Sequence, residues 1–181
     1  MRCLGIEQRF LARNGEIRLG EPVAAAIVLR NIGTATTGVL LGERKEPPYK
    51  GRKFPPGGTV EKREDVSRAA IRELREETGI YATLEDLYPI STMLMGIYPP
   101  DNKGIVRPFY PFHILVWRSE MGKLSNLIPE KTESWEWVPL FYSVLTRDAR
   151  IPNNIAAILQ HVLFEVIAED KAWFRERGLR V

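Results

Sequence analysis

Apolar and polar residues follow one another along the chain in a pattern that predicts strands on both sides of a central helix. Residues 22–31 (PVAAAIVLRN) form a nearly continuous apolar run, which is typical of a buried strand, and residues 38–45 (GVLLGERK) predict its hairpin partner. Residues 64–78 are rich in Glu, Arg and Ala and contain no Gly or Pro, so they predict a helix that stops at Gly79. The other expected elements are strands within residues 81–98, 107–120 and 134–145, and a last helix opened by residues 151–154 whose apolar stripe runs from Ile155 to Ile167. Strands around one helix, followed by a second helix, predict a mixed sheet between helical layers.

The composition is that of an ordinary globular protein. The 181 residues are 44% hydrophobic and 27% charged, and the net charge is +3. Basic residues are interleaved with acidic ones, which argues against a nucleic-acid groove, so no nucleic-acid polymer is expected as a partner. Cys3 is the single cysteine, and no apolar run approaches the length of a membrane span. We therefore expect a cytoplasmic protein without a membrane partner.

Three glutamates of the predicted helix fall on one narrow face. Glu76 and Glu77 lie three and four residues after Glu73, and at about 100° per residue this spacing brings all three together. Like charges at such spacings repel, so helix propensity alone does not explain them. A divalent cation would remove the penalty, because hard cations bind several carboxylate oxygens at one point. The plainer interpretation is a solvated helix in which these glutamates pair with Arg72 or Arg75.

The stretch around these glutamates resembles a known motif. It reads GGTVEKREDVSRAAIRELREETGI over residues 57–80: Gly58, five residues, Glu64, seven residues, and then the sequence of residues 72–80. This is the spacing of the Nudix box, and every fixed position is filled. The chain therefore resembles the MutT/Nudix hydrolase family, whose members hydrolyse nucleoside diphosphates linked to another group.

The resemblance implies a fold and domain boundaries. It implies an α/β class protein, an α/β/α sandwich with a mixed central sheet. A single domain is expected over residues 1–181, with its core at about 20–168. Residues 1–20 would be an N-terminal extension and residues 169–181 a C-terminal tail. A homodimer is left open, in which exposed aromatic side chains such as Trp173 and Phe174 could take part.

The resemblance also assigns roles within the box. Mg²⁺ or Mn²⁺ would be held by the Gly57 carbonyl and by Glu73, Glu76 and Glu77, with Glu76 as a third ligand or as the group that orients the attacking water. Arg72 would hold a carboxylate in place. Such a cation neutralises phosphate charge and lowers the pKa of a bound water.

Other candidate residues lie outside the box. In several family members the general base lies outside the box. Glu130 and Glu133 are the candidates here, with no ground to choose between them. In the MutT-like branch of the family a basic residue at the end of the strand of residues 38–45 meets phosphate, which here would be Arg44, together with Lys45. A basic loop just before the box contains Lys50, Arg52 and Lys53, which form either an ordinary solvated loop or a phosphate-facing lip.

The substrate depends on segments outside the box. Residues 39–45 and 129–140 resemble the MutT-like branch, which implies conversion of a (deoxy)nucleoside triphosphate to the monophosphate and pyrophosphate. Tyr98, eighteen residues after Ile80, favours a dinucleoside polyphosphate instead, because its ring could stack on a second base. His113 could line the base pocket. A Nudix-fold module without turnover is the alternative of another class, but such modules have broken boxes, and this box is intact.

Overall fold

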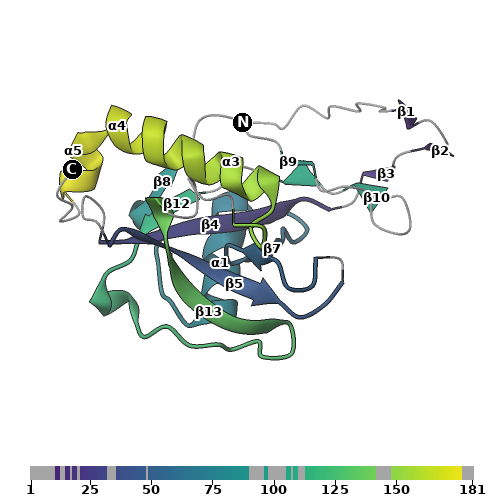
Figure 1. The fold of residues 1–181 in the computed structure, drawn as a ribbon, viewed down its shortest axis with the longest axis horizontal. Coiled ribbons are helices and arrows are strands. Elements are labelled where there is room, and N and C mark those ends of the chain that lie inside the picture. Colours follow the sequence, from purple (N-terminus) through teal and green to yellow (C-terminus); the bar gives the residue numbers. More distant parts are fainter. Residues whose placement is uncertain are drawn as a thin grey trace.

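The computed structural model describes residues 21–31, 36–47, 49–89, 113–141 and 148–176, together with six two-residue strands elsewhere. A mixed sheet lies between helix α1 (Val66–Thr78) on one face and helices α3 (Asn153–His161) and α4 (Ile167–Glu169) on the other (Figure 1). This arrangement confirms the predicted α/β/α sandwich with a mixed sheet. The two-residue strands are β1 (Leu11–Ala12), β2 (Gly15–Glu16), β3 (Arg18–Leu19), β9 (Gly96–Ile97), β10 (Ile105–Val106) and β11 (Pro108–Phe109).

Strand β4 (Val23–Arg30) is the centre of the sheet. It runs parallel to β12 (His113–Val116), which in turn pairs antiparallel with β8 (Leu87–Pro89). Its antiparallel partner β5 (Gly38–Arg44) also pairs with β13 (Thr132–Pro139). The expected hairpin between residues 22–31 and 38–45 is therefore present.

Strands β4 and β5 pair only at one end. Their register joins Leu29 to Val39 and Arg30 to Gly38, whereas Val23, Ala24 and Ala25 pair with β7 (Gly57–Thr59). The far end of β5 pairs with β6 (Lys53–Phe54). The two strands therefore diverge, and β7, which carries the glycine pair, enters the sheet where they separate.

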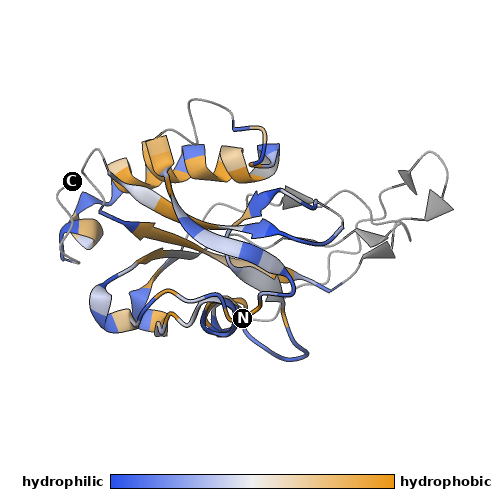
Figure 2. Cartoon of the chain, turned by 60° about the horizontal axis from the view of Figure 1, so that its bottom comes forward, coloured by the Kyte–Doolittle hydropathy of each residue, from blue (hydrophilic) through white to orange (hydrophobic). Residues whose placement is uncertain are grey.

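Alternating side chains of β4 serve two cores. Ile27 and Leu29 belong to the larger core, which α3 and α4 cover, and Ala26 and Val28 belong to the core under α1. Hydrophobic colour is concentrated in α3 and in the central strands in Figure 2, as this division requires. A π-helical stretch, Val162–Val166, links α3 to α4. Two short 3₁₀ turns lie at Leu84–Asp86 and Ser119–Met121.

Helix α1 has well-defined ends. The Asp65 carboxylate accepts hydrogen bonds from the backbone N–H groups of Ser67 (2.9 Å) and Arg68 (3.4 Å), so Asp65 is the N-cap. Gly79 ends the helix at φ 73°, a conformation that glycine adopts without a Cβ penalty. The predicted end was right, and the predicted start at Glu64 was two residues early because the cap comes first.

The C-terminal segment belongs to the core. Helix α5 (Lys171–Glu176) places Phe174, with 0% exposure, against Tyr88 at 5.7 Å between ring centroids, and Trp173 packs edge-on to Tyr88 at 5.0 Å. The expectation that these two aromatic side chains are exposed was wrong, because they cover Tyr88 of β8. These two side chains therefore give no support to a homodimer, which stays a prediction. Among the described residues, no helix is long and apolar enough to cross a bilayer.

Candidate functional site

The glycine pair allows helix α1 to approach strand β7 closely. The Gly57 backbone N–H donates a hydrogen bond to Glu77 Oε2 at 3.0 Å. A Cβ added at Gly58 would lie 2.4 Å from the carboxyl carbon and Oε1 of Glu73, and one at Gly57 would lie 2.4 Å from the Ala24 carbonyl oxygen. A side chain at Gly58 would push the Glu73 carboxylate away from β7, and one at Gly57 would collide with β4, with which β7 pairs. The pair therefore lets Glu73 and Glu77 lie against β7.

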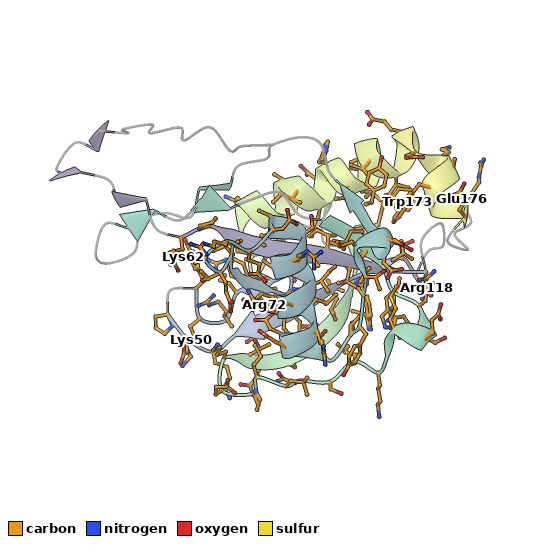
Figure 3. All side chains as sticks on the ribbon, turned by 180° about the vertical axis from the view of Figure 1, so that it is seen from behind. Lys50, Lys62, Arg72, Arg118, Trp173 and Glu176 are labelled. Atoms are coloured by element: carbon orange, nitrogen blue, oxygen red, sulfur yellow. The ribbon has the colours of Figure 1, made fainter. Side chains whose placement is uncertain are left out.

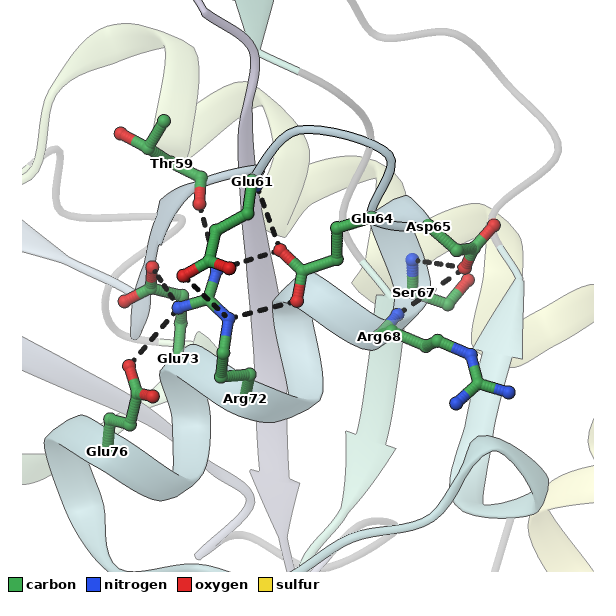
Figure 4. Close-up of polar contacts among 9 residues, drawn as sticks. All are labelled: Thr59, Glu61, Glu64, Asp65, Ser67, Arg68, Arg72, Glu73 and Glu76. Carbon is green, nitrogen blue, oxygen red and sulfur yellow. Dashed lines mark hydrogen bonds and ion pairs between the residues drawn. The ribbon is translucent and has the colours of Figure 1, made fainter.

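Arg72 connects the carboxylates to one another and to β7 (Figure 4). Its guanidinium binds Glu64 through two hydrogen bonds of 2.9 Å, and Nη1 donates to both Glu73 (2.8 Å) and Glu76 (3.1 Å). Nη2 also donates to the Thr59 carbonyl oxygen at 2.9 Å. The hydrogen bonds from Arg72 hold the Glu64 pKa below its usual range, and the same contacts raise the pKa of Arg72. Figure 3 views this side of the molecule and shows Arg72 on α1, with Lys50 and Lys62 to one side.

Burial opposes ionisation of two of the three glutamates on the carboxylate face of α1. Desolvation raises the pKa of Glu77 to about 8, with the negative charge of Glu73 adding to it and the Gly57 hydrogen bond opposing it. Desolvation likewise raises the pKa of Glu73, against the opposing effect of Arg72. Glu76 is different, since its side chain is 56% exposed. The site thus contains two carboxyl groups whose pKa burial raises and one that water reaches freely.

The donor set suits a hard divalent cation. Glu73, Glu76 and Glu77 supply carboxylate oxygens, and Gly57 supplies a backbone carbonyl beside them. Within the described part of the chain, no three His, Cys, Asp or Glu side chains are already gathered as a metal site. The reason is visible in the contacts: Glu73 and Glu76 turn toward Arg72, and Glu77 accepts from Gly57. Rotation of these side chains would let a cation relieve the repulsion between Glu73 and Glu77.

Two basic residues outside α1 act on the carboxylates through their charge. The positive charges of Arg44 and Lys131 both lower the pKa of Glu77, and Lys131 also lowers that of Glu73. Arg44 was expected to meet phosphate. Lys131 was not among the predicted site residues, because nothing in its spacing distinguishes it from the other lysines of the connector. Only the pairing of Lys45 N–H with the Lys131 carbonyl oxygen, at 2.8 Å, shows that this residue lies beside the end of β5.

The remaining predicted site residues are spread more widely. Lys45 donates to the Pro129 carbonyl oxygen (3.0 Å) and forms an ion pair with Glu133 (3.4 Å), and Glu130 is exposed. Their assignment to phosphate binding and to the general base stays a prediction. His113 lies on β12 opposite Ala26, and no side-chain position is described for it; Tyr98 lies outside the described residues.

Lys53 does not belong to the basic lip. Its side chain is 1% exposed and its ammonium forms an ion pair with Glu136 of β13. The expectation failed because β6 turns this residue inward, whereas Lys50 and Arg52 are exposed. The Arg52 carbonyl oxygen accepts from the Arg44 backbone N–H at 2.9 Å, so the exposed part of this loop lies beside Arg44.

A groove of about 810 Å³ runs along the outward side of α1. It shares Glu64, Arg72 and Glu76 with the carboxylate site. Its far wall contains three large exposed apolar side chains: Tyr81, Leu84 and Leu127.

The family model described as NUDIX domain matches residues 20–150, well over half of the chain. The chain belongs to the Nudix family. The recognition made from the box is therefore confirmed, and the fold agrees with a solved Nudix structure. An Ap4A hydrolase of Caenorhabditis elegans, at 19% identity, superposes with a TM-score of 0.55 over 81% of this chain and 98% of its own. At that identity, the likeness shows the fold alone.

Relatives of this Nudix protein carry different names. An RNA pyrophosphohydrolase of Brucella abortus is 27% identical over 162 residues, which are 81% of this chain and 85% of that protein. An ADP-ribose pyrophosphatase of Methanocaldococcus jannaschii is 40% identical over 65 residues, which are 36% of this chain and 34% of that protein. The matches to the first three curated relatives span between 20% and 38% of those proteins' lengths. The names of these relatives thus point to different substrates.

Proposed function

We propose that this Nudix protein is a divalent-metal-dependent hydrolase of an acid anhydride, with Mg²⁺ or Mn²⁺ as the metal. The reaction proposed is a (deoxy)nucleoside triphosphate plus water giving the monophosphate and pyrophosphate. The observation that carries the proposal is the carboxylate face of α1, which is held against the glycine pair. The positive charges of Arg44 and Lys131 act on its Glu77. Acidic groups for a cation beside basic groups for phosphate are what a polyphosphate substrate requires.

The box residues have two proposed roles, binding the metal and positioning its ligands. Gly57, Glu73 and Glu77 would bind the cation, and Glu76 would be either a third carboxylate ligand or the group that orients the attacking water. The cation, when present, neutralises phosphate charge and makes water more acidic. Arg72 is a positioning residue, because it contacts Glu73 and Glu76 and fixes both to β7 through Thr59. Its guanidinium keeps the two carboxylates in place before substrate arrives.

Glu76 is the box carboxylate best placed to orient water. Its side chain is the most exposed of the three box carboxylates that would bind metal, and Arg72 holds one of its oxygens at 3.1 Å. We infer that its other oxygen accepts a hydrogen bond from the attacking water and receives its proton. Glu130 and Glu133 stay as alternative bases, and the ion pair with Lys45 makes Glu133 the less free of the two.

A larger leaving group is the second candidate. The groove beside Glu76 has room for a nucleoside, and its wall combines the Tyr81 ring with the Arg75 guanidinium 4.7 Å from the ring centroid. This observation favours substrates with a nucleoside on both sides of the phosphates, such as diadenosine polyphosphates, which a ring like that of Tyr81 can stack upon.

A hydrolysis panel with product identification tests the proposal. It contains dGTP, 8-oxo-dGTP, dCTP, diadenosine tetraphosphate, ADP-ribose, NADH and a capped RNA, each with Mg²⁺ and with EDTA. A 5′-triphosphate RNA is added because a relative is named for it. Preferred turnover of a nucleoside triphosphate with release of pyrophosphate supports the main proposal, and preference for the dinucleotide supports the second. Absence of turnover on all substrates would favour a binding module.

A further inference from the structure

The groove along the outward side of α1 is continuous with the carboxylate site. Arg72 and Glu76 line the groove and are joined to each other by a hydrogen bond of 3.1 Å. Its volume of about 810 Å³ is within the size range of pockets that enclose small ligands. A substrate whose phosphates lie at Glu76 can therefore extend into the groove with the group on the far side of the cleaved bond.

Tyr81 is the aromatic side chain of this groove, and it is held in place. Its backbone N–H donates to the Met121 carbonyl oxygen at 2.7 Å, and the Arg75 guanidinium lies 4.7 Å from the centroid of its ring. The side chain is nevertheless 57% exposed. A fixed, exposed ring is a good stacking surface, because little conformational freedom is lost when a flat group binds to it.

Two exposed leucines line the groove together with Tyr81. Leu84 is 46% exposed and Leu127 is 54% exposed. Leu127 is anchored to the end of α1, because its N–H donates to the Glu77 carbonyl oxygen at 3.1 Å and its Cδ1 lies 3.6 Å from the Cβ position at Gly79. Three large apolar side chains thus meet water in one groove, and the flat face of a nucleobase would cover them.

The polar groups of the groove offer no pattern that reads one base. Among the described lining residues, the two carboxylates accept from Arg72, and the Thr83 hydroxyl donates to a carboxylate of its own turn at 2.8 Å. The other polar groups are the Tyr81 hydroxyl and the guanidinium groups of Arg68 and Arg75. A guanidinium only donates, so it does not read the amino group that distinguishes one purine from another. Stacking on an aromatic ring tolerates every base, because each base has a π-face.

We propose that this groove binds the base of a leaving nucleotide by stacking on Tyr81, and that it accepts adenine and guanine alike. The inference rests on the proposed function and deepens its second candidate, because the polyphosphate must lie at the carboxylate site for a base to reach the groove. Tyr81 is then a specificity-determining residue. It strengthens binding of dinucleoside polyphosphates more than that of a triphosphate, whose leaving pyrophosphate carries no base.

The test compares Tyr81→Leu and Tyr81→Phe with a matched control, Phe141→Leu, which alters an aromatic side chain of the same 57% exposure outside the groove. The ligands are diadenosine and diguanosine tetraphosphates whose bridging oxygens are replaced by methylene groups, so that they resist hydrolysis, and inorganic tripolyphosphate, which has no base. Each is titrated calorimetrically in the presence of Mg²⁺.

Tyr81→Leu should weaken binding of both dinucleotide analogues about 10-fold or more, as expected for the loss of a stacked base. Its binding of tripolyphosphate should stay within about twofold of the wild type, as should the binding of every ligand by Phe141→Leu. Tyr81→Phe should also stay within about twofold, because phenylalanine keeps the ring. The wild type should bind the two analogues within about fivefold of each other, since no paired contact to a base edge separates them.

Steady-state hydrolysis is the second readout, in which Tyr81→Leu should raise KM for diadenosine tetraphosphate more than KM for dGTP. Equal binding of the analogues by Tyr81→Leu and Phe141→Leu would overturn the inference. So would a wild type that binds the analogues no more tightly than tripolyphosphate, and a strong preference for one purine would overturn the acceptance of both. If the wild type turns over no nucleotide, the proposed function fails, and the calorimetry alone still decides whether Tyr81 binds a base.

Discussion

Glu77 is placed where its charge is useful for binding a cation and costly without one. Its pKa is raised from 4.5 to about 8, chiefly by burial. A carboxyl group with a raised pKa in the folded state stabilises the fold fully below its unfolded pKa, and that stabilisation is lost as pH rises through the folded pKa. Metal-free protein should therefore lose stability between about pH 4.5 and pH 8.

Glu77→Gln should remove this loss, because glutamine stays neutral and its oxygen can still accept from the Gly57 N–H. We expect the metal-free variant to be more stable than the wild type at pH 8 by on the order of a few kcal/mol. Its melting temperature should be higher by about 5 °C or more at pH 8, and nearly equal at pH 4.5. Adding Mg²⁺ should stabilise the wild type alone. If the melting temperatures of the wild type and Glu77→Gln changed equally with pH over this range, the raised pKa of Glu77 would be contradicted.

Gly58 tests the close approach of β7 to the helix. In Gly58→Ala the new Cβ would meet the Glu73 carboxylate at 2.4 Å, so that carboxylate must move. A displacement of about 1 Å in a catalytic group can cost on the order of 100-fold in rate, and a loss of that size is expected here. Gly38→Ala is the control, since its Cβ would meet its neighbours at 3.5 Å or more. Equal activity of both variants would show that Glu73 need not lie where the structure places it.

At the scale of elements, Arg72 fastens α1 to β7 and to the turn before the helix. A lysine at this position keeps the charge but cannot reach Glu64, Glu73, Glu76 and the Thr59 carbonyl oxygen at once. Arg72→Lys should weaken Mn²⁺ binding and lower kcat by about 10- to 100-fold, as loss of a positioning residue typically does. Paramagnetic detection of bound Mn²⁺ measures the first effect directly. Unchanged Mn²⁺ affinity would limit Arg72 to a purely structural role.

The helix and the strands beside it could be predicted because their signals are local. The composition of residues 64–78 and the stop at Gly79 define α1, and the spacing of its glutamates defines its functional face. The partner of Arg72 could not be predicted in the same way. Glu64 binds it across a turn, a contact that depends on how the chain enters the helix. Lys53 shows the same limit, since its burial follows from the pairing of β6.

At the scale of the whole molecule, the core extends past the residues that the family model matches. That match ends at residue 150, whereas Phe174 of α5 is fully buried in the larger core. Phe174→Ala should reduce the free energy of unfolding by about 3 kcal/mol or more, because a buried ring is lost and a cavity remains. Denaturant unfolding measures this, and kcat of the folded variant should be close to that of the wild type. A loss below about 1 kcal/mol would show that α5 is only loosely attached.

The layered architecture was predictable, and the shape of the site within it was not. Apolar periodicity is enough to expect a mixed sheet covered by two helical layers. The divergence of β4 and β5, which admits β7 beside α1, depends on pairings between residues far apart in sequence, such as Ala25 with Gly57.

The carboxylate face of α1 is proposed to hydrolyse a nucleoside triphosphate to the monophosphate and pyrophosphate in a metal-dependent reaction. Phosphorus NMR of the products formed from dGTP, with Mg²⁺ or with EDTA, tests it most directly in the wild type and in Glu77→Gln. The account predicts dGMP and pyrophosphate from the wild type with Mg²⁺, and no products with EDTA or from Glu77→Gln. Release of orthophosphate and dGDP, or full turnover by Glu77→Gln, would contradict it.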